Sequence, residues 1–193
     1  MARVLNFPMG ERRSDFADAV VTSFTLTGAL FLVLGVELIF HLNLSQFGIV
    51  PRTEAGLPGI VFSPLLHANL RHLLANALPL FILLLLLLSN RAYHPYGTLA
   101  FIWFASGLGT WLIGRGNAVH IGASSVIFGL AAFLIVAGFL MRSWRSAFVA
   151  IFVFLFYGGI FYGVLPRNGP ISWEGHLCGA LAGVLAAFVQ REK

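Results

Sequence analysis

Long apolar runs separated by short polar stretches dominate the chain. Six of these runs are continuous, and we interpret them as helices over about residues 19–42, 72–89, 96–113, 122–141, 147–165 and 173–189. None of them alternates between apolar and polar positions as the strands of a membrane barrel do. A helix satisfies its backbone hydrogen bonds internally, which the interior of a bilayer requires. The pattern therefore predicts an all-α integral membrane protein with six transmembrane helices.

The composition agrees with this class. Hydrophobic residues make up 59% of the 193 residues and charged residues only 10%, whereas a soluble domain carries about 25% charged residues. Disordered chains are poor in apolar residues and are excluded too. Because one spanning helix takes about 20 residues, six helices fill the chain. We expect a single membrane domain over residues 1–193, with residues 1–18 as a cytoplasmic N-terminal tail.

The basic residues predict the orientation. One set of alternate loops and ends carries Arg3, Arg12, Arg13, Arg91, Arg142, Arg145, Arg191 and Lys193, and the other set carries Arg52, Arg71, Arg115 and Arg167. This excess predicts that both termini are cytoplasmic, in a multi-pass protein of the cell (plasma or inner) membrane. The bases form no stripe, so we expect no nucleic-acid partner. The single cysteine, Cys178, has no second cysteine for an internal disulfide.

Four polar residues stand near the starts of the second, fourth and sixth predicted helices. They are His72, Asn76, Ser124 and His176. With a cytoplasmic N-terminus these three helices all start at the outer face, so the four residues share one layer about 5–10 Å below it. Polar groups inside a membrane are costly and are functional candidates.

The chemistry that fits this layer is nucleophilic. A serine becomes a nucleophile when a base such as histidine lies beside it. Ser124 stands where a helix begins, and the free N–H groups there suit a developing oxyanion. His72 and Asn76 share one helix face, and both can donate hydrogen bonds to an oxyanion. Since the later five segments contain no aspartate, a Ser124–His176 dyad is the arrangement left.

Structural roles compete with this interpretation. Ser124 also suits an N-cap, and His72 also suits an interfacial position at a helix end. Gly179 and Gly183 have the small-xxx-small spacing of closely packed helices. Such packing brings His176 towards a neighbouring helix.

Other polar residues are less informative. His67 lies in the long stretch before the second helix, where it either lines a route for water or has no role. His41 and His120 are expected at the membrane interface. Glu37, inside the first helix, has no assignment, and Glu174 is expected on a different helix face from His176.

Three motifs carry a resemblance to a known family. His67, His72 and Asn76 fit H-x4-H-x3-N; the stretch 122–125 is similar to G-x-S-G; and the stretch 176–183 is similar to H-x2-G-x3-G. The motifs occur in this order on the second, fourth and sixth segments. Over about residues 64–189 the chain therefore resembles the rhomboid family of intramembrane serine proteases.

The resemblance implies a rhomboid-like six-helix bundle and a role for each motif residue. Ser124 would be the nucleophile and His176 the general base, with His72, Asn76 and the Ser124 backbone N–H stabilising the oxyanion. Phe128 matches an aromatic position that packs on the catalytic histidine. The supporting positions of these motifs are Gly122, Gly179, Gly183 and His67.

The resemblance also implies the substrates. They would be transmembrane proteins in the lipid bilayer, cut near the outer face, with no cofactor and no metal ion. Substrates would reach a water-filled cavity laterally, near the second and fifth helices. The fifth segment carries four phenylalanines, which suit a gate or plain lipid-facing packing equally: Phe148, Phe152, Phe156 and Phe161.

Two positions depart from the family pattern, and two other functions compete. Ser125 replaces the glycine after the nucleophile, and the Trp-Arg pair of the first loop is absent, with Pro51-Arg52 as its nearest remnant. The first loop is therefore expected to diverge in structure.

A rhomboid-like pseudoprotease that binds clients without cleaving them is the main alternative function. A small transporter would need inverted repeats and midplane charges, and Glu37 is the one such charge.

Overall fold

The computed structural model describes residues 9–167, 169 and 171–191. The named secondary-structure elements within them are all helices. The α-helices are α1 (Met9–Ile39), α2 (Gly59–Phe62), α3 (Leu70–Leu88), α4 (Pro95–Ile113), α5 (Ser124–Leu140), α6 (Trp144–Tyr157) and α7 (Trp173–Arg191). Short 3-10 turns are η1 (Leu44–Phe47), η2 (Glu54–Gly56), η3 (Ser63–Leu65), η4 (Arg91–Tyr93) and η5 (Gly158–Val164). The all-α prediction is confirmed for this part of the chain.

The predicted segments differ from the helices in two places. The first helix begins at Met9 instead of about residue 19, because its polar start contains good helix formers although it lacks an apolar pattern. Of the predicted tail, residues 1–8 lie outside the described residues. The fifth segment divides into α6 and η5 at Gly158 and Gly159, since glycine weakens an α-helix and the chain tightens into 3-10 geometry.

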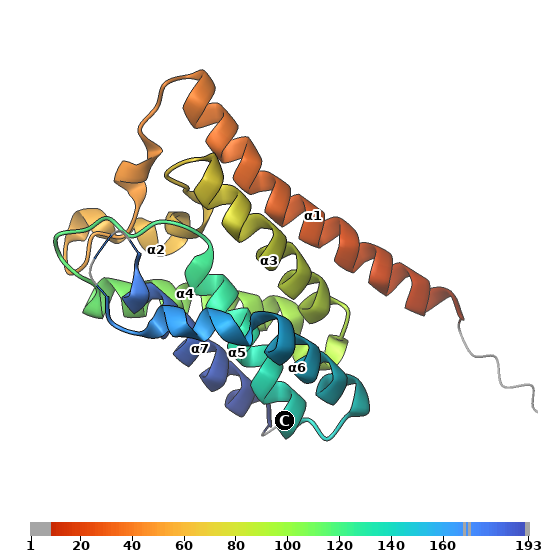
Figure 1. Ribbon diagram of the computed structural model, residues 1–193. Helices are drawn as coiled ribbons and strands as arrows, with labels where there is room; N and C mark the ends of the chain where they lie inside the picture. Colours follow the sequence, from red (N-terminus) through yellow and green to blue (C-terminus); the bar gives the residue numbers. More distant parts are fainter. Residues whose placement is uncertain (1–8, 168, 170, 192–193) are drawn as a thin grey trace, which may run out of the picture.

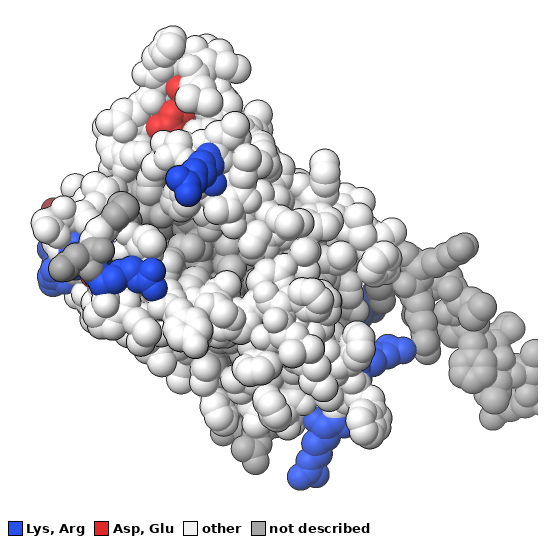
Figure 2. Space-filling model, viewed as in Figure 1, with Lys and Arg blue, Asp and Glu red and all other residues white. Residues whose placement is uncertain are grey.

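The helices suit a membrane. Four helical stretches of the described chain are long and apolar enough to span one: Phe16–Ile39, Leu70–Leu88, Arg91–Ile113 and Trp144–Val164. The apolar helix α5 is shorter, with 17 residues, and α7 does not join the four. The surface seen in Figure 2 is mostly uncharged, with basic side chains as a few isolated patches and an acidic patch near the top. The protein is a membrane protein, which agrees with its composition.

Helix α5 lies at the centre of the fold. Ten of its 17 residues are buried, and it packs against α3, α4, α6 and α7, while α1 lies alongside α3 (Figure 1). The starts of α5 and α7 lie at the same end of the molecule as α2 and the long stretch that precedes α3 (Figure 1). The fold thus brings two segments of the predicted site to one end.

Glycines allow α5 and α7 to touch through their backbones. A Cβ atom added to Gly179 would lie 2.0 Å from the carbonyl oxygen of Ser125, and one added to Gly183 would lie 2.0 Å from that of Gly129. No side chain fits in such a space. The small-xxx-small spacing therefore corresponds to a close helix crossing next to the start of α5.

The long stretch between α1 and α3 is held against α4 by hydrogen bonds to backbone carbonyls. The indole N–H of Trp103 donates to Val61 O (3.0 Å), and that of Trp111 donates to Thr53 O (2.9 Å). The Arg52 guanidinium donates to two carbonyls at the end of α4, at 3.0 and 2.8 Å. These donors anchor the stretch that lacks the family's Trp-Arg pair.

Glu37 has a structural role. Its Oε1 accepts a hydrogen bond of 3.0 Å from the backbone N–H of Leu44, just beyond the end of α1. The carboxylate thus satisfies a backbone donor in the turn that follows the helix. The nearby His41 is exposed, as expected for an interfacial residue.

Candidate active site

Ser124 and His176 lie within hydrogen-bonding distance. Ser124 is the first residue of α5, His176 is in the first turn of α7, and Ser124 Oγ lies 3.0 Å from His176 Nε2. The close crossing of the two helices accounts for this approach, since it starts one residue after the serine, at Ser125. The structure therefore brings together the two residues that the sequence proposes as a dyad.

The other ring nitrogen of His176 has a fixed partner. Nδ1 lies 3.1 Å from the carbonyl oxygen of Gly163 in η5. A carbonyl only accepts, so Nδ1 must carry the proton, and Nε2 is left to accept from the Ser124 hydroxyl. This tautomer is the one that a general base needs.

Aromatic rings hold the His176 imidazole in its plane. The Phe128 ring stacks on it with centroids 4.1 Å apart and an angle of 10° between the planes. Phe161 of η5 packs edge-on against Phe128 at 5.9 Å. A Cβ atom on Gly163 would lie 2.7 Å from Phe128 Cζ and 3.1 Å from His176 Nδ1. The absence of a side chain at residue 163 thus lets the ring stack and the carbonyl contact coexist.

The N-cap alternative for Ser124 does not fit. Ala123 occupies the N-cap position of α5, and no side chain caps this helix. Within the described chain, the backbone N–H groups of Ser124 and Ser125 have no hydrogen-bond partner. Free N–H groups at a helix start, with the positive end of its dipole, suit an oxyanion.

His72 lies beside Gly122, two residues before Ser124. A Cβ atom on Gly122 would lie 2.8 Å from both Cε1 and Nε2 of the His72 ring. Gly122 has φ of +111° and donates its N–H to Ser63 O at 2.8 Å. Glycine adopts this backbone conformation without the strain a side chain would bring, and it also leaves the space that the imidazole occupies.

Asn76 and His67 are buried on either side of His72. Asn76 Nδ2 donates to the carbonyl of His72 at 2.8 Å, which occupies one of its two N–H groups. The His67 ring is 2% exposed and packs edge-on against the His72 ring at 5.1 Å. Burial lowers the pKa of His67 to about 4, so it is neutral at physiological pH. His67 therefore supports the position of His72 and faces no open water.

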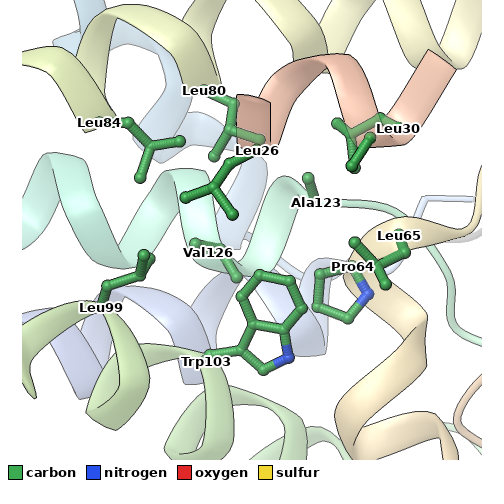
Figure 3. Close-up of a pocket in the computed structure, with 11 residues that line it drawn as sticks. Leu26, Leu30, Pro64, Leu65, Leu80, Leu84, Leu99, Trp103, Ala123 and Val126 are labelled. Carbon is green, nitrogen blue, oxygen red and sulfur yellow. The ribbon is translucent and has the colours of Figure 1, made fainter. Parts of the chain in front are cut away.

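Two small cavities adjoin the start of α5. A polar one of about 20 Å³ is lined by Ser63, Thr110, His120, Ser125 and Ser172, among others, and it is large enough for one water molecule. Ser125, where the family has glycine, thus lines a polar space. The other, of about 40 Å³, lies between α1, α3, α4 and α5 and has apolar walls, including Trp103 and Val126 (Figure 3). It presents no group for catalysis.

Two charged residues near the dyad form a pair that the sequence did not indicate. Glu174 is 1% exposed, and its Oε1 lies 2.7 Å from Arg115 Nε. A carboxylate at the start of a helix and an arginine in a distant loop carry no local signal of pairing. His120, expected at the interface, is 4% exposed and lies 2.5 Å from Ser172 Oγ through Nδ1. Burial lowers the pKa of His120.

The remaining polar groups offer no metal centre in the described chain. No three of its His, Cys, Asp or Glu side chains lie close enough together to hold a metal ion. Cys178 is buried and free.

Comparison with known proteins identifies the family. The Rhomboid domain family matches residues 55–193, which include every motif residue named above. Uncharacterized proteins of Mycobacterium tuberculosis and Mycobacterium bovis are each 42% identical over 187 residues, covering 92% of this chain and 78% of theirs. An uncharacterized protein of Mycobacterium leprae is 40% identical over 188 residues, covering 92% of this chain and 74% of its own. The chain therefore belongs to the rhomboid family.

Proposed function

We propose that the protein is an intramembrane serine endopeptidase that hydrolyses peptide bonds of transmembrane substrates near the outer membrane face. The observation that carries this proposal is the 3.0 Å contact between Ser124 Oγ and His176 Nε2, with Nδ1 oriented by Gly163 O. Membership of the rhomboid family supports the reaction class. The reaction needs no cofactor.

The residues have the following roles in this mechanism. The Ser124 hydroxyl gives its proton to His176 Nε2 as Oγ attacks the substrate carbonyl carbon. The oxyanion that forms receives hydrogen bonds from the Ser124 N–H, the His72 ring and the remaining N–H of Asn76. His176 then protonates the leaving amine, and the acyl group stays on Ser124. Water, activated by His176, hydrolyses this ester and restores the hydroxyl.

The proposed topology has six spanning helices with both termini in the cytoplasm of a cell-membrane protein. In this scheme α5 and α7 join the four stretches given above as spans, and the starts of α3, α5 and α7 face outwards. The bundle forms a single domain over residues 1–193, with core motifs in 64–189. Substrates enter laterally between α3 and the α6–η5 segment, where exposed phenylalanines such as Phe148 (72%) and Phe156 (71%) face the lipid.

The test compares cleavage of a reporter transmembrane substrate in liposomes by the parent and a Ser124→Ala variant. We expect the variant to lose at least about 10³-fold in kcat/KM, because the nucleophile is gone. Ser89→Ala, at the end of α3, is the matched control, since its hydroxyl only bonds Leu85 O. Labelling of the parent by a fluorophosphonate probe should map to Ser124.

Two results would contradict the proposal. One is equal cleavage by the parent and Ser124→Ala, which would exclude this nucleophile. The other is a folded parent that binds the substrate without cleaving it or reacting with the probe, which would instead support the pseudoprotease.

A further inference from the structure

The pair formed by Arg115 and Glu174 lies next to the dyad but takes no part in the proposed chemistry. Glu174 precedes His176 by two residues, and its side chain is almost fully buried. Its Oε1 lies 2.7 Å from Arg115 Nε in an ion pair, and neither carboxylate oxygen has a hydrogen-bond partner in the described chain. A buried carboxylate without a counter-charge is strongly disfavoured. The burial of the Glu174 carboxylate therefore depends on the positive charge of Arg115.

Arg115 also binds the backbone that leads into α7. Its Nη1 donates to the carbonyl of Gly169 at 3.2 Å and its Nη2 to that of Ile171 at 2.6 Å. A guanidinium has its donors in a rigid planar fork, so these three contacts are made in one fixed geometry. The arginine thus contacts the chain before and at the start of α7 at three residues, Gly169, Ile171 and Glu174.

A second connection reinforces the first. His120 Nε2 lies 3.2 Å from the carbonyl of Arg115, and Nδ1 lies 2.5 Å from Ser172 Oγ. The carbonyl of Ser172 in turn accepts the backbone N–H of His176 at 3.2 Å. A continuous series of contacts therefore joins the loop before α5 to the backbone of the general base.

We propose that Arg115 and Glu174 are positioning residues that set the distance between Ser124 and His176. The loop that carries Arg115 runs directly into Ser124, and the segment that it holds runs directly into His176. One ion pair thus links the loop that leads into Ser124 to the segment that leads into His176. This role rests on the proposed function, because it concerns the same two residues.

The activity test uses Glu174→Ala, Arg115→Ala and the double variant. We expect kcat to fall by about 10- to 100-fold in each single variant with KM within about twofold, because a small displacement of the base misaligns proton transfer. The double variant should lose no more than Arg115→Ala alone, since both substitutions break the same ion pair. Arg115→Lys, which keeps the charge, should recover part of kcat. Glu54→Gln, an exposed carboxylate on the outer loop, is the matched control.

A second measurement does not require activity. Hydrogen exchange of residues 169–176 should become faster in Glu174→Ala, while residues 130–140 in the interior of α5 keep the parent's rate. Where alanine variants unfold, Glu174→Gln and Arg115→Lys keep side chains of similar size and take their place.

The outcomes separate the two proposals. Parent-like kcat in Glu174→Ala, additive losses in the double variant, or unchanged exchange in residues 169–176 would each overturn the positioning role. A parent as inactive as Ser124→Ala would refute the proposed function instead, and hydrogen exchange would then decide alone whether the pair holds the segment.

Discussion

The α5–α7 crossing and the α6–η5 segment hold His176 from two sides, yet they are built differently. In the crossing, Gly179 and Gly183 bring the backbones of the two helices into contact, and most of α5 is buried. In the α6–η5 segment, only 11% of the apolar stretch is buried, compared with 39% in α3. The crossing places the ring of His176, whereas η5 contributes the Gly163 carbonyl that orients its tautomer and the Phe161 ring that packs on Phe128.

Because of this difference, we expect substitutions in the crossing to change the stability of the fold and substitutions in η5 to change the rate of catalysis. Changes in the crossing should unfold the protein, since two backbones must move apart. Changes in η5 should alter the orientation of His176 and leave the rest of the fold intact. A lightly packed segment also opens at lower cost than a buried helix.

The largest effect is expected for Gly179→Leu. The new side chain would meet the Ser125 carbonyl, where even a Cβ would approach to 2.0 Å, so we expect a loss of about 4 kcal/mol in unfolding free energy and no measurable cleavage. Gly28→Leu in α1 is the matched control, because nothing lies within 4 Å of its added Cβ. Thermal unfolding in detergent measures both. A Gly179 variant as stable as the control would mean that the crossing is not tightly packed.

Acid should lower the unfolding free energy of the protein through protonation of the buried His67. Its pKa is lowered from 6.5 to about 4 in the folded protein, so between these values the unfolded chain binds more protons. The stability contributed by neutral His67 is complete above pH 6.5, falls as the pH drops towards 4, and amounts to about 3 kcal/mol.

The check for this titration is a His67→Asn variant followed from pH 7 to pH 4. The variant should lose less stability over this range than the parent does. Parallel curves for the two proteins would show that His67 is not the group that titrates.

A smaller effect, confined to rate, is expected for Gly163→Ala in η5. The added methyl would press on Phe128 and on His176 Nδ1, which weakens the contact that fixes the tautomer. We expect kcat to fall by about 10-fold, or about 1.4 kcal/mol, with little change in the unfolding temperature. Gly159→Ala in the same turn has nothing within 4 Å and should keep the parent's kcat. Equal rates for these two variants would contradict the role of the Gly163 carbonyl.

The smallest effect is expected for Phe154→Ala on the lipid-facing side of α6. Phe154 is 62% exposed, whereas Phe133 in α5 is fully buried. We expect a change within about 0.5 kcal/mol for Phe154→Ala and a loss of about 3–5 kcal/mol for Phe133→Ala. Similar losses for the two variants would show that α6 packs as firmly as α5.

The sequence predicted the parts of the site that have side-chain signals. Ser124 and His176 were placed together by topology and motif, and the glycine spacing foretold the crossing. The orienting partner of His176 could not be predicted, because Gly163 acts through a backbone carbonyl that every residue possesses. The pairing of Arg115 with Glu174 depends on two loops meeting in space, which no local pattern records.

The helix boundaries and Glu37 also show which features the sequence predicts and which are visible only in the structure. The apolar runs located the long helices to within a few residues, but α1 begins ten residues early, at Met9 instead of about residue 19, because helix propensity there is independent of hydropathy. Glu37, inside the first predicted helix, had no assignment from the sequence. Its partner is a backbone N–H in the following turn, and such local satisfaction of a polar group is visible only in three dimensions.

The two indoles that hold the stretch between α1 and α3 against α4 also make its attachment observable by fluorescence. Trp103 and Trp111 each donate to a loop carbonyl, and their emission should change when these hydrogen bonds break. The other two tryptophans, Trp144 and Trp173, would add a background, which Trp144→Phe and Trp173→Phe remove. The protein thus contains an intrinsic fluorescent reporter, with which loop release could be timed against substrate turnover without any added label.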